Sequence, residues 1–355
     1  MKTFSCLCGN ILFYENAKCL TCGREVGWCP LCQQLVTLLP EACGGYRCGQ
    51  PDCGTSLQKC YNYAVEQVCN RCLAVGAEGQ TPESLCDCCR YNETIPDLSV
   101  PGNREKWYRI EVAKRRLFYT LNLLSLPYGR TSDGFSPPLA FDFKADVLPA
   151  THLWRTMGPV ERVYTGHANG KITLNIREAD DVVREKLRAD FGEAHRTLIG
   201  HFRHEIGHYY WELLVPGRCE VDFQHAFGDY QHPPYAAALE QYYQNGPPSD
   251  WQQQYVSAYA SMHPWEDFAE TFATYLAMVC VLDTARNMGI DGVFVPPDAD
   301  FDQIAAHYQR LGMVMNEMNR AMGLIDLVPQ VFVSPVLEKL RYLHTLVRTA
   351  GQVHS

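Results

Sequence analysis

The chain has 355 residues, enough for two domains, and a formal net charge of −9. This negative charge argues against a protein that binds nucleic acid through phosphate contacts. The sequence contains no uninterrupted apolar run long enough to span a membrane and no apolar signal core after Met1, so we expect a cytoplasmic protein without a membrane span.

The first 90 residues hold most of the cysteines. Fifteen of the 17 lie between Cys6 and Cys89, mostly as short-spaced pairs. In a reducing compartment such pairs indicate thiolate zinc sites rather than disulfides or iron–sulfur clusters. We expect two four-cysteine sites and a third that the remaining pairs can form: Cys6, Cys8, Cys19 and Cys22; Cys29, Cys32, Cys48 and Cys53; Cys60, Cys69, Cys86 and Cys89. Cys43, Cys72 and Cys88 are left over.

This pattern predicts a zinc-ribbon domain over residues 1–90. Its seven Lys and Arg against eight Asp and Glu give no electrostatic support to nucleic-acid binding. We therefore favour docking of a protein partner or capture of a substrate. Residues 91–103, with Pro96 and Pro101, are expected to form a linker.

Residues 104–355 predict a mainly helical domain with a small sheet. Apolar residues at helical spacing predict a helix from Arg104 to Leu124. Asn169-Gly170 predicts a hairpin turn, and residues 172–176 predict a strand. We expect an edge strand to which an extended substrate can add, and the alternative is an ordinary strand of the sheet. The long segment 222–251 predicts a lid or a region with short helices of its own.

A predicted helix around residues 198–214 carries the motif His204-Glu205-Ile206-Gly207-His208. Positions four apart share one helix face, so both imidazoles can reach one Zn²⁺ at about 2.0–2.1 Å. Glu205 can take a proton from a zinc-bound water. Gly207 costs about 1 kcal/mol of helix propensity, which indicates that another segment passes close to the backbone there. The alternative is a helix that carries two histidines by chance.

A catalytic zinc needs a third protein ligand. The metzincin spacing is excluded, because Trp211 and Leu214 stand where its Gly and His would be. Glu266 and Glu270 lie four apart on a helix predicted over residues 263–276. One carboxylate would bind zinc and the other would orient a ligating imidazole, although both could also be ordinary surface charges.

The same helix has Pro264 in its first turn, with Ser261 as the expected cap. Three further histidines are not assigned as ligands. His201 lies near the face of His204 and is expected to be structural, while His225 and His232 lie in the segment between the two helices.

These residues resemble known zinc peptidases. The H-E-x-x-H motif with a distant E-x-x-x-E resembles the gluzincin class, and the spacing of Tyr259, Glu266 and Glu270 is similar to the active site of anthrax lethal factor. This resemblance implies Glu266 as the third zinc ligand and Glu270 as its supporting carboxylate. It also implies that Tyr259 reaches toward the scissile carbonyl.

A wider resemblance covers nearly the whole chain. It is carried by residues 92–98, 165–168, 172–176, 201–211 and 257–260. Together they resemble the bacterial zinc-binding metallopeptidases that carry an N-terminal zinc ribbon. The resemblance favours the third cysteine group, because members of that family keep a C-x₂-C immediately before the run R-x-N-x-T-I-P-D-L.

The sequence therefore predicts an α+β protein, with a zinc-ribbon domain followed by a mainly helical, zincin-like metallopeptidase domain with a small sheet. We expect one catalytic zinc and about three structural zincs, and a peptide or protein as substrate. Glu205 would be the general base and Tyr259 would stabilise the oxyanion. The alternatives are a non-catalytic scaffold with a degenerate peptidase domain, which the intact Glu205 argues against, and a zinc hydrolase of non-peptide amides.

Overall fold

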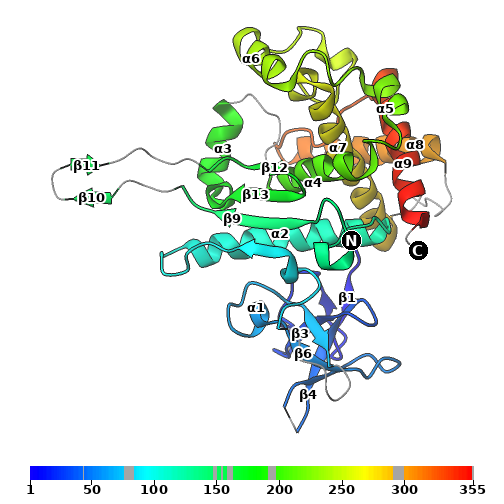
Figure 1. Cartoon of the computed structure of the whole chain (residues 1–355). Coiled ribbons are helices and arrows are strands. Elements are labelled where there is room, and N and C mark those ends of the chain that lie inside the picture. Colours follow the sequence, from blue (N-terminus) through cyan, green and yellow to red (C-terminus); the bar gives the residue numbers. More distant parts are fainter. Residues whose placement is uncertain are drawn as a thin grey trace. The chain divides into compact units, whose positions relative to one another are not determined.

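The computed structural model describes residues 1–42, 44–75, 84–146, 150–152, 155–157, 163–190, 197–290 and 300–353. They belong to two compact units (Figure 1). The first comprises residues 1–116, 140–165 and 173–186, and the second comprises residues 117–139, 166–172 and 187–355. Helix α2 (Asn103–Leu123) continues from the first unit into the second.

The first unit begins with a small antiparallel region. A hairpin of β1 (Phe4–Ser5) and β2 (Ile11–Leu12) precedes a five-stranded sheet. The order of that sheet is β3 (Val26–Cys29), β4 (Gln34–Pro40), β5 (Tyr46–Cys48), β6 (Ser56–Lys59), β7 (Cys72–Ala74). The short helix α1 (Tyr61–Ala64) lies between β6 and β7, and the single turn η1 (Cys89–Tyr91) follows β7. Cysteine side chains fill much of this interior, because the apolar strands are short.

A four-stranded sheet lies mostly in the first unit. Its order is β12 (Gly166–Ala168), β13 (Lys171–Asn175), β9 (Ala140–Lys144), β8 (Asn92–Thr94), with β8 parallel to β9. Strand β8 thus forms inside the segment expected to be a linker. The other described elements here are the hairpin of β10 (Ala150–His152) with β11 (Arg155–Met157), η3 (Ile176–Ala179) and α3 (Asp181–Asp190).

The hairpin turn at Asn169-Gly170 is confirmed. Both residues have positive φ, 48° and 80°, as a tight two-residue hairpin requires. The expectation that residues 172–176 form an edge strand is wrong, because β13 has a neighbour on each side. Alternation along a strand reports which face is buried, and it does not report how many strands pair with it.

The second unit is mainly helical, so the α+β class is confirmed (Figure 1). Its helices after α2 are α4 (Leu198–Leu214), α5 (Glu220–Phe227), α6 (Tyr235–Asn245), α7 (Pro264–Asn287), α8 (Phe301–Ala321) and α9 (Ser334–Val353). Single turns η2 (Thr131–Asp133), η4 (Trp251–Gln253) and η5 (Tyr259–Met262) lie between them. Segment 222–251 therefore contains short helices of its own, which confirms one of the two alternatives predicted for it.

Helices α4 and α7 cross at Gly207. A Cβ atom built on Gly207 would lie 2.9 Å from Cα and 3.1 Å from the carbonyl oxygen of Ala269. Only glycine allows this approach, so the close contact predicted from its helix cost is confirmed. Aromatic side chains continue the contact on both helices, with the rings of Tyr210 and Phe272 stacked at 5.3 Å.

Helix α7 begins as predicted at Pro264 but has a different cap. His263 adopts an extended backbone, and its Nδ1 accepts a hydrogen bond from Trp265 N at 3.1 Å. Ser261 is not the cap, because its hydroxyl donates to the carbonyl of Ala258 at 2.6 Å. The helix also continues to Asn287, well past residue 276, because no Gly or Pro interrupts it.

Among the described residues, α7 is the one helix long and apolar enough to cross a membrane. Of the window that meets this criterion, 56% is buried inside the structure. The finding is weak evidence for a membrane span, because buried core helices meet the same criterion.

Candidate metal centres

Two histidines of α4 and a glutamate of α7 converge in the second unit. His204 Nε2 and His208 Nε2 are 3.1 Å apart, and Glu266 Oε2 lies 3.0 Å from the first and 3.3 Å from the second. Ligands at about 2.0–2.1 Å in a tetrahedron around zinc are separated by about 3.3–3.4 Å. The three atoms are thus spaced nearly as ligands of a single zinc ion would be.

The charges of these groups also fit a cation. Burial alone would raise the pKa of Glu266, but the two imidazoles hold it well below its usual range, as a carboxylate. Two imidazole nitrogens only 3.1 Å apart repel each other unless a proton or a metal lies between them. A single divalent cation would satisfy all three groups at once.

A chain of hydrogen bonds fixes the orientation of His204. Its Nδ1 donates to Glu270 Oε1 at 2.6 Å, and Ser257 Oγ donates to Glu270 Oε2 at 2.7 Å. Ser257 Oγ in turn accepts from Ala260 N at 3.1 Å. With its proton on Nδ1, the ring presents the Nε2 lone pair toward Glu266 and His208. Glu270 therefore lies behind a histidine, and Glu266 lies among the donor atoms.

His208 is held by stacking instead. Its ring lies 3.6 Å from that of Trp265, with 25° between the planes. Its Nδ1 is buried and has no hydrogen-bond partner among the residues that the structure describes.

Tyr235 of α6 was not anticipated from the sequence. Its hydroxyl donates to Glu266 Oε1 at 2.7 Å, which leaves Oε2 directed at the two imidazoles. It lies 31 residues before Glu266, and the short helices expected in this segment do not indicate which of its side chains reach the site.

Tyr259 lies beside the same group. Its ring centroid is 6.1 Å from that of His204. Burial raises the pKa of Tyr259 far above its ordinary value, so the hydroxyl stays protonated and can donate a hydrogen bond.

Glu205 is buried next to both histidines. A carboxylate oxygen of Glu205 and the ligand nitrogens of His204 and His208 all lie within 4.8 Å of one another. Burial raises the pKa of Glu205 to about 7, against the opposing effect of His204. A carboxyl group with a pKa near neutrality is well suited to take up and return a proton.

The remaining histidines of this unit join none of the candidate metal groups among the described residues. His201 is half-buried on α4, one turn before His204. His232 Nδ1 lies 3.2 Å from Asp229 Oδ2 at the surface, and His225 lies in the last turn of α5.

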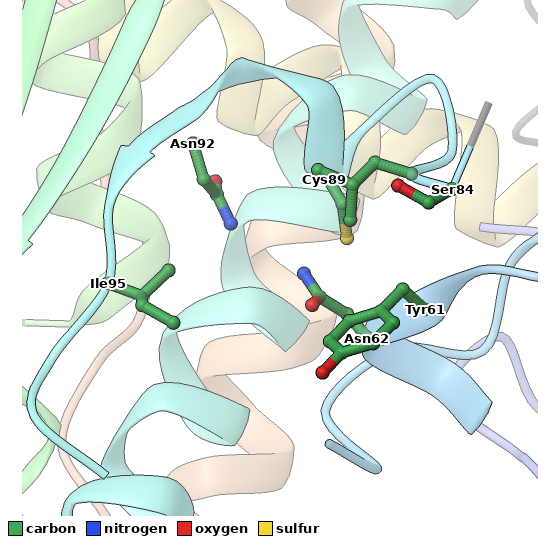
Figure 2. Close-up of a pocket in the computed structure, with 7 residues that line it drawn as sticks. Tyr61, Asn62, Ser84, Cys89, Asn92 and Ile95 are labelled. Carbon is green, nitrogen blue, oxygen red and sulfur yellow. The ribbon is translucent and has the colours of Figure 1, made fainter. Parts of the chain in front are cut away.

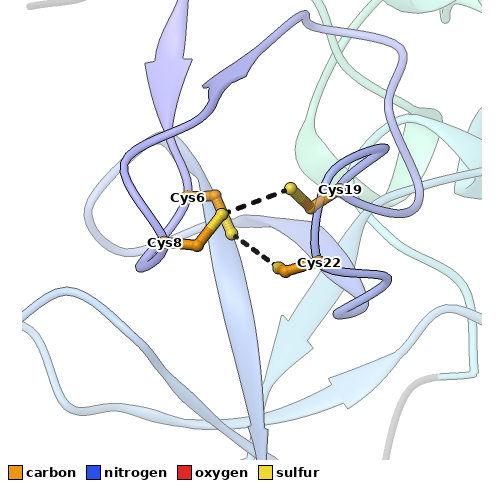
Figure 3. Close-up of side chains that lie close together, drawn as sticks. All are labelled: Cys6, Cys8, Cys19 and Cys22. Atoms are coloured by element: carbon orange, nitrogen blue, oxygen red, sulfur yellow. Dashed lines mark hydrogen bonds between the residues drawn. The ribbon is translucent and has the colours of Figure 1, made fainter.

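Twelve of the described cysteines of the first unit form three groups of four, with the sulfurs of each group within 4.8 Å of one another. Figure 3 shows the first, in which Sγ atoms of Cys8 and Cys19 are 3.7 Å apart and those of Cys6 and Cys22 are 3.6 Å apart. Sulfurs at about 2.3 Å from a tetrahedral zinc are about 3.8 Å apart. The other groups are those expected, Cys29, Cys32, Cys48 and Cys53, and Cys60, Cys69, Cys86 and Cys89.

Distances in those two groups agree with the same geometry. The pairs Cys29–Cys53, Cys32–Cys48 and Cys69–Cys86 are each 3.8 Å apart between sulfurs. Cys72 and Cys88 are buried outside the groups. Cys43 lies outside the described residues.

A pocket of about 300 Å³ lies beside Cys89 in the first unit (Figure 2). It is lined by Tyr61, Asn62, Ser84, Leu85, Cys89, Asn92 and Ile95. The lining offers amide and hydroxyl groups but no acid–base pair, so we assign the chemistry to the histidine and glutamate group of the second unit.

Comparison with known proteins agrees with both regions. The sequence profile of a family described as "Putative zinc-binding metallo-peptidase" matches residues 103–346, and a zinc-ribbon domain profile matches residues 3–100. Uncharacterized proteins of Mycobacterium tuberculosis and Mycobacterium bovis are 37% identical to the chain. Each alignment covers 98% of this chain and 95% of the relative. No solved structure matches the chain.

Proposed function

Because the chain belongs to this zinc-binding metallopeptidase family, we propose that it is a zinc-dependent enzyme that hydrolyses peptide bonds. The observation that carries the proposal is the convergence of His204 Nε2, His208 Nε2 and Glu266 Oε2 within 3.0–3.3 Å of one another. Three protein donors leave one position of a tetrahedral zinc open for water or substrate, which is typical of catalytic zinc. His204, His208 and Glu266 would hold the ion.

When bound, zinc supplies Lewis acidity that favours ionisation of a water molecule and polarises a carbonyl oxygen. In the proposal, Glu205 takes the proton of the attacking water and later returns it to the leaving amine. Its elevated pKa supports both roles. Tyr259 donates a hydrogen bond to the carbonyl oxygen as negative charge develops there. Glu270, with Ser257, keeps His204 oriented throughout.

The three four-cysteine groups are proposed as structural zinc sites, which gives four zinc ions per chain with the catalytic one. We propose that this zinc-ribbon region docks a protein partner or the substrate. Clusters of thiols that bind zinc persist in a reducing compartment, which supports a place of action in the cytoplasm.

The test compares wild-type protein with Glu205→Gln and Glu212→Gln. Both substitutions remove one carboxylate from α4, but only Glu205 lies in the proposed reaction. Zinc content is measured first, and each protein is then incubated with a broad peptide library whose cleavage products are identified by mass spectrometry. We expect equal zinc in all three proteins, cleavage by wild type and Glu212→Gln, and none by Glu205→Gln.

Two outcomes would contradict the proposal. Cleavage by Glu205→Gln at the wild-type rate would show that Glu205 is not the base. A zinc-loaded wild type that cleaves no peptide would favour the scaffold alternative, and activity confined to non-peptide amides would change the substrate class.

A further inference from the structure

The third cysteine group differs from the other two in its burial. Cys60, Cys69, Cys86 and Cys89 are only 0%, 3%, 1% and 0% exposed. Each of the other groups has two thiols that reach the surface or lie half-buried. Zinc with four thiolates carries a net charge of −2, and a buried charge of this size is costly unless opposite charge lies close by. A zinc in the third group therefore requires buried cations.

Among the described residues of the first unit, three cationic side chains are buried. Arg71, Lys114 and Arg115 are 2%, 0% and 1% exposed. Lys114 and Arg115 lie on α2 and Arg71 lies between Cys69 and Cys72. Long cationic side chains are almost never fully buried without a counter-charge.

Each cation contacts a segment that carries a cysteine of the third group. Arg115 Nη1 donates to the carbonyl of Val68 at 2.7 Å, directly before Cys69. Arg71 makes two hydrogen bonds to the carboxylate of Asp87, directly after Cys86. Lys114 Nζ donates to the side-chain oxygen of Asn92, which lies three residues after Cys89.

The nearby carboxylates do not balance these cations. Lys114 is paired with buried Glu111 at 3.0 Å, and Arg71 with Asp87, whose side chain is 48% exposed. Arg115 has no carboxylate partner of this kind, and its buried Nε and Nη2 have no hydrogen-bond partner among the residues that the structure describes. Burial lowers the pKa of Arg115, but the nearby groups Cys69, Glu111, Cys88 and Cys89 raise it above its ordinary value.

The third group itself can supply negative charge beside these cations, because a zinc ion bound by its four thiolates would carry a net charge of −2.

We propose that Arg115 and Lys114 are the counter-charges of a buried zinc–tetrathiolate centre at Cys60, Cys69, Cys86 and Cys89. This inference rests on the proposed zinc occupancy of the cysteine groups. Both cations lie within residues 103–346, the metallopeptidase match, whereas all four thiols lie within residues 3–100, the zinc-ribbon match. The last zinc site of the ribbon is thus completed by the first helix of the region that follows it.

The test uses full-length zinc-loaded protein and three variants. Arg115→Met removes the charge at similar length, Arg115→Lys keeps a charge, and Arg116→Met removes the charge of the neighbouring residue, whose side chain is 45% exposed. Zinc content and the rate of zinc release to a chromophoric chelator are recorded. We expect Arg115→Met to release one zinc equivalent about 10–100-fold faster than wild type, since groups behind metal ligands have effects of this size. Arg115→Lys should show a smaller increase and Arg116→Met none.

Two results would overturn the inference. In one, Arg115→Met releases all zinc at the wild-type rate. In the other, Arg115→Lys is as impaired as Arg115→Met, which would indicate packing rather than charge. If Arg115→Met does not fold, Lys114→Met is judged by the same two criteria, against Lys114→Arg. Failure of the zinc assignment itself would look different, because wild-type protein would then hold fewer than three slowly released zincs.

Discussion

The two kinds of candidate metal site in this chain differ in the number of donors and in how they are assembled. Each cysteine group supplies four sulfurs, which fill the coordination sphere of zinc. The group in the second unit supplies two imidazoles and one carboxylate, with the buried carboxyl group of Glu205, the proposed general base, beside them. A complete donor set suits a structural role and an incomplete one leaves room for chemistry.

The two kinds of site also differ in how far apart their ligands lie in the sequence. The first cysteine group closes within 17 residues, from Cys6 to Cys22, as two short-spaced pairs. In the second unit, His204 and Glu266 are brought together only by the packing of α4 on α7. Loss of a ligand should therefore unfold a cysteine site locally, but should empty the histidine site without unfolding its helices.

The largest effect expected is on folding of the first unit. Cys69→Ser should lose one structural zinc, a site that can contribute on the order of 10 kcal/mol of folding free energy. Cys72→Ser is the matched control, because Cys72 is equally buried three residues away and lies outside the four-cysteine groups. Zinc content and thermal unfolding distinguish the two variants. Equal zinc loss in both would mean that the third group is wrongly composed.

The second largest effect that we expect is the loss of zinc from the proposed site in the second unit. Glu266→Ala should empty that site while the cysteine-bound zincs remain, because it removes one of three donors. Glu270→Ala should weaken zinc binding only about 10–100-fold, since it acts through the orientation of His204. Zinc titration of both variants, with helicity followed by circular dichroism, provides the measurement. The reverse order of severity would exchange the roles of the two glutamates.

A purely catalytic effect is expected at Tyr259. Tyr259→Phe removes one hydroxyl and should lower kcat about 10²–10³-fold with a smaller change in KM, because its hydrogen bond strengthens as charge develops on the oxygen. Steady-state kinetics on a substrate from the peptide library test this. A rise in KM at unchanged kcat would assign Tyr259 to substrate binding instead.

The smallest effect is expected at Tyr235. Tyr235→Phe removes the hydrogen bond to Glu266 Oε1 and should weaken zinc binding about tenfold. Tyr243→Phe, on the same helix with a side chain 66% exposed, is the control and should bind zinc like wild type. Zinc affinity is measured by competition with a chelator. Equal affinity of the two variants would mean that Glu266 does not depend on this hydroxyl.

The cysteine groups could be predicted from the sequence more completely than the site in the second unit. Pairs of cysteines a few residues apart predict their own grouping, and all three groups meet in the structure as expected. The motif at His204 to His208 predicts one face of one helix, and Gly207 predicts a close neighbour without saying which. The place of Tyr235 depends on packing between segments far apart in sequence, so no local pattern could report it.

Two local predictions failed for physical reasons. Ser261 has the right side chain for a cap, but His263 directly precedes Pro264 and occupies that position. The strand at residues 172–176 has the expected hairpin turn, but its pairing with β9 depends on a strand formed some 30 residues earlier.

The crossing at Gly207 bears on metal selectivity. Backbone atoms of α4 and α7 are in contact there, so the separation of the helices is set by the main chain and not by adjustable side chains. The distance between the backbones that carry the two imidazoles and Glu266 is therefore constrained. It suits an ion with bonds of about 2.0–2.1 Å, whereas Ca²⁺, with bonds of about 2.3–2.6 Å and six to eight oxygen ligands, would have to force the helices apart. We therefore expect Gly207, which has no metal-binding group, to favour zinc over calcium at the proposed site.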